Sequence, residues 1–532
     1  MYIEPNTNIK ILHNVPLENT YDHSLYFASA TAQYNYFASM VYKNCVNYTY
    51  QRVNKGVMRI DGKADLYYNC NYLMFQNTNF GNKWFYAFIT SVEYINNETT
   101  EITFEIDVIQ TWLFDAHIEE CFIERQHSLS DGIGDNIIPE NLNMGEYVFN
   151  NYEPVMNTTG HKLDNMCVII AITDTTQATS GQLYDGIYGG AKLLAYNSTD
   201  VSAINSKINE YLQKPDAITA MYMCPKEIIG TIPTSHILPY GASGFRQIIQ
   251  KTAVAKTMSL DGYTPKNGKM YTYPYNFYHV DNASGQELNL RYEFFDDLTP
   301  MVEIDGTITQ PVQVTLRPVN YKGMPHYTPP SGGGIQNPPT TLNTEVIQLN
   351  NYPMCSWNVD AYQAWVAQNA IPIGYGVINT LATGGIASNY SAHPAGTMGA
   401  GIVGSVTSVL SDWYKASIQA DISKGSFNNG GVNTAIGKQQ FYGGRCSVNY
   451  QTAKMIDDYF TMFGYAVKAI GRPYLHARPH WTYIKTLGCT LSGSIPSDDA
   501  KKIISVYDNG ITFWMNANEV GNYSLDNSLN ES

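Results

Sequence analysis

Apolar and polar residues alternate most clearly between residues 84 and 114. A strand-like run ends at Asn96 and Asn97, and apolar residues then return at every second position, at Ile102, Phe104, Ile106 and Val108. A period of two places these side chains on one face of a strand, with the polar residues between them on the other. The pattern therefore predicts a β-hairpin with one wet face.

Two later stretches also show strand patterns. Apolar residues alternate with other residues at Leu288, Leu290, Tyr292, Phe294, Val302, Ile304, Val312, Val314 and Leu316. This predicts further antiparallel strands. Before them, residues 160–280 combine an apolar run at 167–172 with a helix expected at about 201–212, which indicates an α+β region.

Proline and glycine mark the main break in the chain. Residues 317–340 carry so many of both that we predict a linker or a long excursion. Beyond it, helical spacing predicts a helix at 454–467, and no repeat of 20–50 residues is visible. We expect a multi-domain chain that is mainly β with α+β insertions, divided into 1–150 (β-rich), 151–285 (α+β), 286–345 (strands and the excursion), 346–445 (an uncharged loop region) and 446–532 (α+β).

Composition adds an expectation of partners. Charged residues make up only 15% of the 532 residues, against about 25% in typical proteins, and there are 42 tyrosines. Tyrosine suits half-buried strand faces and subunit contacts. The net charge of −14 argues against a general nucleic-acid binder. It is compatible with a conduit that releases DNA quickly, but simple solubility is the favoured explanation.

Cysteine usage and the first residues indicate an intracellular origin. The eight cysteines are scattered without metal-type pairs, so we expect reduced, buried thiols. The sequence after Met1 has no basic region followed by an apolar run, so no secretory signal peptide is expected. We expect assembly in a cytoplasm.

From residue 361 to residue 411 the chain contains no Asp, Glu, Lys or Arg. Small residues such as Ala400 and Gly404 recur among aliphatic ones, while Pro372 and Pro394 interrupt any single spanning helix. The pattern fits a membrane-active loop, and a buried glycine-rich interface or core segment fits it equally well. For the membrane-active loop we single out Trp365, Ile371, Ile373, Tyr375, Val377, Ile378, Leu381, Ile386, Met398, Ile402, Val403, Val406, Val409, Leu410 and Trp413.

A search for catalytic chemistry finds no pattern that points to a reaction. The paired carboxylates are Asp296–Asp297, Asp457–Asp458 and Asp498–Asp499, for which surface or helix-capping roles are favoured. Prolines beside His476 and His480 disturb a helical metal pair. No hydrolase, P-loop, zincin or dinucleotide motif occurs. We expect no enzyme, no cofactor and no metal site.

Three segments carry a resemblance to a known family. They are EYINNETTEITFEIDVIQT at 93–111, FIERQH at 122–127 and GITFW at 510–514. These segments resemble the tail knob (distal tail tube) proteins of small phi29-type podoviruses that infect Gram-positive bacteria. The resemblance is closest over residues 20–130 and weaker over 459–515.

The resemblance implies a homohexameric ring of tail-tube-like β-barrel modules at the tail tip of the virion. DNA would pass through its channel without specific binding. Long hydrophobic loops would plug the tube and later insert into the lipids of the host cytoplasmic membrane, and the uncharged segment falls where such a loop belongs. Expected partners are other copies of the chain and other phage tail proteins (lower collar or tail tube). The alternative is a receptor-binding or cell-wall-degrading tail protein.

Overall fold

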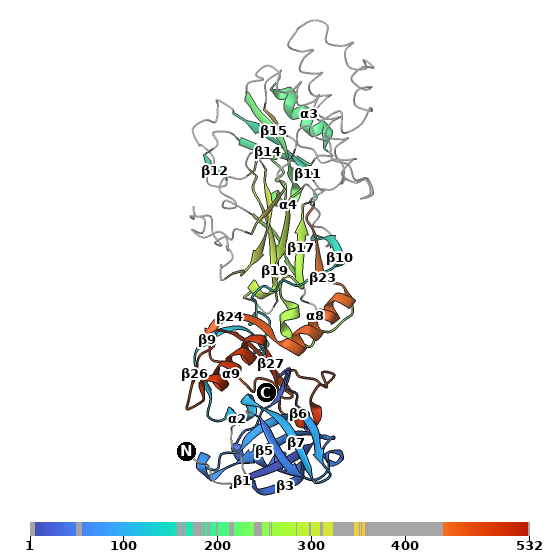
Figure 1. Cartoon of the computed structure of the whole chain (residues 1–532). Helices are drawn as coiled ribbons and strands as arrows, with labels where there is room; N and C mark the ends of the chain where they lie inside the picture. The colour runs from blue at the N-terminus through green and yellow to red at the C-terminus, as the bar shows by residue number, and fades with distance from the viewer. Residues whose placement is uncertain are drawn as a thin grey trace. The chain divides into compact units, whose positions relative to one another are not determined.

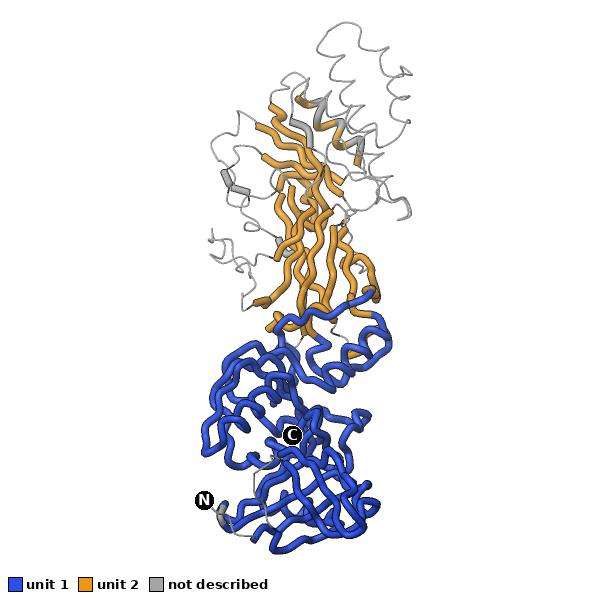
Figure 2. Tube along the Cα trace, in the orientation of Figure 1, with its two compact units in different colours: residues 1–145, 262–271, 449–532 blue, residues 146–261, 272–448 orange. Residues whose placement is uncertain are grey.

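The structure is a computed structural model in which two compact units are built from separate parts of the chain (Figures 1 and 2). Unit 1 comprises Met1–Gly145, Gly262–Tyr271 and Asn449–Ser532, and unit 2 comprises Glu146–Asp261 and Thr272–Val448. The residues described are 6–48, 56–156, 163, 166–173, 183–184, 187–188, 192–197, 200–211, 217–238, 247–254, 256, 258–282, 285–296, 299–308, 312–322, 345–349, 352, 354–356 and 440–529.

Unit 1 contains a six-stranded sheet and a five-stranded sheet. The six-stranded sheet has the order β3 (Val41–Tyr48), β1 (Thr7–His13), β5 (Cys70–Gln76), β6 (Phe85–Asn96), β7 (Thr99–Ile106) and β4 (Val57–Asp61). The five-stranded sheet has the order β2 (His23–Leu25), β27 (Ile511–Trp514), β25 (Trp481–Leu487), β9 (Cys121–Gln126) and β24 (Tyr465–Gly471). A small pair joins β26 (Leu491–Ser492) to β8 (His117–Ile118), and the helices are α1 (Ala30–Ser39), α2 (Val108–Trp112), α8 (Tyr450–Phe463) and α9 (Ser497–Asn509).

The six-stranded sheet has apolar side chains packed on both faces. In β5, Tyr72 and Met74 join one core cluster, and Leu73 and Phe75 join another. The first cluster also holds the tryptophans of β25 and β27, so it links the N-terminal and C-terminal parts of unit 1. Burial on both faces explains why β5 reads as a continuous apolar run.

Residues 262–271 belong to unit 1 because a buried carboxylate of α8 holds them. Asp457 is fully buried and accepts hydrogen bonds from the Tyr263 hydroxyl (2.8 Å), the Lys266 N–H (2.8 Å) and the Asn267 N–H (3.1 Å). The Asn267 side-chain amide donates a further bond to the same carboxylate at 2.9 Å. Burial raises the pKa of Asp457, and these donors oppose that rise.

Helix α8 lies four residues earlier than the predicted helix at 454–467. The Asn449 side chain caps its start by accepting from the Thr452 N–H at 2.9 Å. Gly464 ends it with φ +64°, and a Cβ atom there would lie 2.4 Å from the backbone of Gln126. The predicted end was wrong because residues 465–467 belong to β24.

Unit 2 contains three four-stranded sheets. The β10 sheet has the order β10 (Tyr147–Pro154), β23 (Tyr442–Val448), β17 (Asn276–Asp281) and β18 (Glu287–Leu290). The other two have the orders β14 (Lys192–Asn197), β11 (Met166–Ile172), β15 (Ile218–Pro225), β22 (Met354–Ser356), and β16 (Gln247–Ala253), β19 (Met301–Gly306), β20 (Val314–Val319), β21 (Ile347–Leu349). Unit 2 also has the hairpin β12 (Leu183–Tyr184) and β13 (Ile187–Tyr188) and the helices α3 (Val201–Glu210) and α4 (Lys226–Ile229).

One apolar core cluster joins the three sheets of unit 2. It includes Ile169 of β11, Val280 of β17 and Ile304 of β19, all at most 1% exposed. The β10 sheet contributes only one face to this core, because Val280 points inward while its neighbours His279 and Asp281 point outward.

The predicted hairpin is confirmed as β6 and β7, but Val108 belongs to α2. The Asp107 side chain caps α2 by accepting from the Gln110 N–H at 3.0 Å, and it also accepts from the Tyr72 hydroxyl at 2.8 Å. Burial raises the pKa of Asp107 to about 6. The cap therefore ends the strand two residues before the alternation ends.

Two other strand predictions needed correction. Tyr292 and Phe294 form a 3₁₀ turn (η5, Tyr292–Phe294), in which the Phe294 N–H bonds to the Arg291 carbonyl at 3.2 Å. The predicted strand was therefore wrong at these two residues, where the apolar spacing reflects burial of Tyr292 in a turn. Conversely, β20 continues to Val319 and includes Pro318, which pairs with Val302 of β19. The pairing with β21 covers only Val314–Leu316, so it ends before Pro318 and needs no N–H from it. The rest of the predicted linker, 323–340, lies outside the described residues.

Candidate functional site

The apolar residues predicted to form a membrane-active loop, from Trp365 to Trp413, all lie outside the described residues. Within the part of the chain that the structure does describe, no helix has both the length and the apolar character needed to cross a bilayer. The described part instead presents two exposed apolar surfaces, one on each unit.

An apolar row crosses three neighbouring strands of the five-stranded sheet. Phe122 of β9 is the direct partner of Ile470 on β24 and of Leu487 on β25. Direct partners point to the same face, and the next residue, Ile123, is buried in the core on the other face. Phe122 is 37% exposed, Ile470 76% and Leu487 64%. Together these three side chains form an exposed apolar patch on this face of the sheet.

Paired charges border this apolar row on two sides. Glu124 lies 2.9 Å from Lys485, and Glu119 lies 3.1 Å from Arg472. Each pair cancels its own charge, so the row sits in a neutral part of a chain whose net charge is −14. Two copies of an acidic protein repel least where such a neutral, apolar surface meets.

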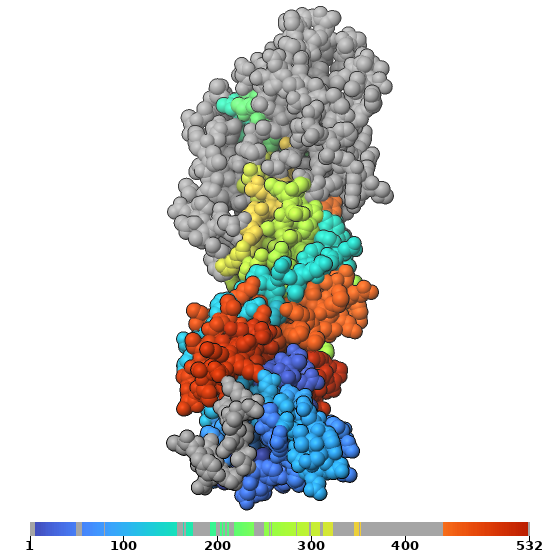
Figure 3. Space-filling view, viewed as in Figure 1, coloured from blue at the N-terminus to red at the C-terminus, as the bar shows by residue number. Residues whose placement is uncertain are grey.

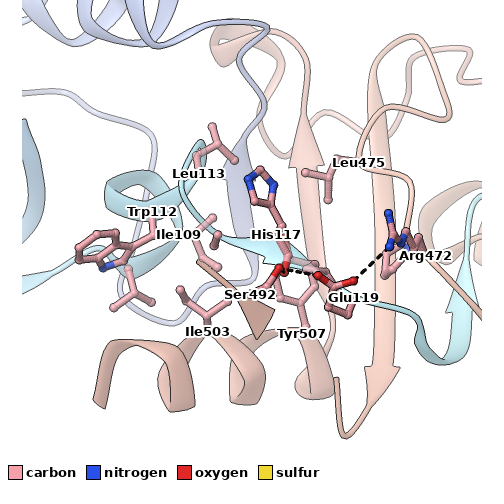
Figure 4. Close-up of a pocket in the computed structure, with 14 residues that line it drawn as sticks. Ile109, Trp112, Leu113, His117, Glu119, Arg472, Leu475, Ser492, Ile503 and Tyr507 are labelled. Atoms are coloured by element: carbon pink, nitrogen blue, oxygen red, sulfur yellow. Dashed lines mark hydrogen bonds and ion pairs between the residues drawn. The ribbon is translucent and has the colours of Figure 1, made fainter. Parts of the chain in front are cut away.

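Unit 1 also has a pocket of about 460 Å³, whose lining includes the Glu119–Arg472 pair (Figure 4). Helices α2 and α9 supply its apolar floor, which includes Ile109, Trp112, Ile503 and Tyr507. Burial raises the pKa of the Tyr507 hydroxyl above its ordinary value. This tyrosine stays neutral at every physiological pH, so the floor carries no charge.

The polar rim of the pocket contains the residue types of a hydrolase triad, but they are not connected as one. The Ser492 hydroxyl donates directly to the Glu119 carboxylate at 2.5 Å, and its contact with His117 is to the backbone carbonyl at 3.5 Å. A nucleophilic serine needs the imidazole between itself and the acid. Glu119 also pairs with Arg472, as Figure 4 shows. These interactions hold the side chains of the pocket rim in place and offer no activated nucleophile.

The paired carboxylates have structural roles where they are described. Asp498 and Asp499 lie in the first turn of α9, as predicted, and Asp499 accepts from the Trp112 indole N–H at 3.0 Å. Asp458 is exposed as expected. The expected surface role was wrong for Asp457, which is buried. In the Asp296–Asp297 pair, only Asp296 is among the described residues.

The histidines and cysteines of the described residues do not gather into a metal site. The His476 ring stacks on Tyr26 with centroids 5.2 Å apart, and His480 Nδ1 lies 2.8 Å from the Glu519 carboxylate. Among the residues described, His, Cys, Asp and Glu form no cluster of three or more that could hold a metal ion. Seven cysteines lie buried, as expected, and none of these seven forms a disulfide in the structure.

The row and the pocket were not found from the sequence. Phe122 stands in a segment that carries the family resemblance, but its partners Ile470 and Leu487 lie more than 300 residues away. Their register depends on tertiary pairing, which a single sequence does not encode in any local signal.

Comparisons with known proteins cover nearly the whole chain. Residues 243–528 match the family model for the C-terminal domain of Bacillus phage phi29 tail knob protein gp9, and residues 5–117 match the caudoviral major tail protein N-terminus. The tail knob proteins gp9 of Bacillus phages PZA and phi29 are each 27% identical to the chain, over alignments of 606 and 605 positions that cover 98% of both partners.

A solved structure supports the same fold at lower sequence identity. The tail knob protein gp12 of bacteriophage C1 aligns with a TM-score of 0.58 and 13% identity, covering 98% of this chain and 99% of its own. It shows the fold alone. The first family model spans more than half of the chain. The chain therefore belongs to the tail knob protein family of phi29-type phages, structural components of the virion tail.

Proposed function

We propose that six copies of this chain form a tube at the tail tip, built from tail-tube-like β-barrel modules, through which the genome leaves the virion. Membership of the tail knob family and the match of residues 5–117 to a major tail protein support this role. The net charge of −14 favours passage of DNA without specific binding. Other copies of the chain and a lower collar or tail tube protein would be its partners in the virion.

The second part of the proposal assigns membrane entry to residues 361–411. The observation that carries it is the absence of every charged side chain across this segment, between Asp360 and Asp412. Apolar side chains could enter lipid while small residues pack segment against segment. In the virion the same segment would plug the channel, and after release it would penetrate the host cytoplasmic membrane.

A deletion separates the two parts of this proposal. The whole chain and a chain lacking residues 361–411 are compared by native mass and by dye release from liposomes. We expect both to form the same ring and only the whole chain to release dye. If the shortened chain forms no ring and neither protein releases dye, the segment is structural and the membrane role is wrong.

We further propose that copies meet through the apolar row of unit 1. Replacing Leu487 with glutamine should raise the dissociation constant of the ring at least about tenfold, because burying a leucine contributes about 1.5–3 kcal/mol. Sedimentation over a range of protein concentrations measures this. Leu129, which is 60% exposed and outside the row, is the matched control. An equal effect of Leu129→Gln, or none from Leu487→Gln, would exclude the row from the contact.

A further inference from the structure

The outward face of the β10 sheet in unit 2 carries a second exposed apolar surface, made of aromatic rings. β10, β23 and β17 lie side by side in unit 2, and β10 reaches the surface in the space-filling view (turquoise; Figures 1 and 3). Pairing places Phe149 beside Cys446, and Cys446 beside Phe277. The exposed rings of this aromatic face are Tyr147, Phe149 and Tyr152. His279 and Tyr442 are half-buried beside them, and Phe277 is buried beneath Tyr147, with ring centroids 5.4 Å apart.

The rings of the aromatic face hold one another in place. Phe149 meets Tyr152 edge to face with centroids 6.0 Å apart, and it meets His279 in the same way at 5.3 Å. Tyr152 stacks on Tyr442 at 6.1 Å. Phe149 is 49% exposed and Tyr152 46%. The face is therefore rigid before any ligand arrives, which lowers the entropy lost on binding.

Polar groups stand directly beside these rings. Asp281 accepts a hydrogen bond from the Tyr152 hydroxyl, and its carboxylate lies 3.7 Å from His279 Nε2. His279 Nδ1 lies 2.8 Å from the Asn289 amide oxygen. The Asp281 carboxylate raises the pKa of His279 above its ordinary value. The aromatic face therefore presents oriented hydrogen-bonding groups directly beside its exposed rings.

The charges on this face select against anionic partners. Asp281 and Glu287 lie on the outward side, since they are direct partners in register. The arginine of β23, Arg445, pairs with Tyr278 and so points to the opposite, core-facing side. The four strands contain no lysine. Nucleic acids and phosphate-rich polymers are bound mainly through lysine and arginine side chains, which these four strands do not present on their outward side.

We propose that the aromatic face binds a neutral glycan chain, with sugar rings packed on Phe149 and Tyr152 and hydroxyl groups hydrogen-bonded beside them by Asp281. The C–H face of a pyranose is apolar and slightly positive, so it packs on the negative face of an aromatic ring. Hydroxyl groups can solvate the half-buried carboxylate. A protein surface would desolvate that carboxylate, so the observations favour a glycan over a second copy of the chain.

Titration calorimetry of the whole chain with a β-1,4-linked N-acetylglucosamine hexamer and with a β-1,4-linked glucose hexamer tests this proposal. We expect at least one of them to bind and Tyr152→Ala to weaken that binding about tenfold or more. Asp281→Asn should weaken it several-fold while leaving the rings in place. Tyr94→Ala is the matched control, because Tyr94 is 58% exposed on unit 1 and should leave binding unchanged.

Two results would overturn the proposal. The first is that the wild-type chain binds neither hexamer, or that Tyr94→Ala weakens binding as much as Tyr152→Ala. The second is that Tyr152→Ala changes the native mass of the protein while glycan binding is absent, which would make the aromatic face a contact between copies. The first result leaves the proposed tube untouched, and the second would add the aromatic face to the contacts between its copies. Neither result bears on residues 361–411, whose tests use other variants.

Discussion

Replacing Asp457 with alanine should lower the free energy of unfolding of unit 1 by about 3–5 kcal/mol. The carboxylate accepts the main-chain N–H groups of Lys266 and Asn267 in a fully buried setting. Removing it leaves these donors without an acceptor, and each buried unsatisfied donor costs about 1–3 kcal/mol. The Tyr263 hydroxyl loses its partner as well. Residues 262–271 should then detach from α8.

The neighbouring residue provides a matched control for this effect. Asp458 lies on the same helix and is exposed, so Asp458→Ala should change stability by less than about 0.5 kcal/mol. Urea unfolding followed by tryptophan fluorescence measures both, since Trp481 donates its indole N–H to the Thr461 carbonyl of α8 at 3.0 Å. Proteolysis within 262–271 gives an independent reading. If both variants lose the same free energy of unfolding, Asp457 does not anchor residues 262–271.

The helical spacing around Asp457 could have predicted its burial. The buried stripe of α8 includes Ala453, Ile456, Phe460 and Thr461. Asp457 lies four residues from Ala453 and Thr461 and three from Phe460, which places it on the same face. An aspartate on the apolar stripe of a helix predicts a buried polar partner. The identity of that partner, a segment nearly 200 residues earlier, could not be predicted from spacing.

Local pattern predicted the elements of this fold better than it predicted their partners. The β6–β7 hairpin followed from alternation because its two strands are adjacent in sequence. The β10 sheet pairs β10 with β23, about 300 residues later, so no local pattern could place Phe149 beside Cys446. Both exposed surfaces, the apolar row and the aromatic face, arise from such distant pairings. Candidate contact sites in this chain therefore depend on topology more than on motifs.

Replacing Val403 with aspartate should abolish dye release from liposomes while the ring keeps its native mass. A charge near the middle of a bilayer costs about 3 kcal/mol or more per chain, which weakens insertion of each copy about a hundredfold. Asparagine has nearly the same shape as aspartate but no charge, so Val403→Asn should retain much more dye release than Val403→Asp. Acid should restore the aspartate variant, because a membrane raises the pKa of a carboxyl and a protonated side chain enters lipid more readily. If Val403→Asp releases as much dye as the wild type at neutral pH, residue 403 does not enter the bilayer. If both variants lose dye release equally at every pH, packing at this position matters and charge does not.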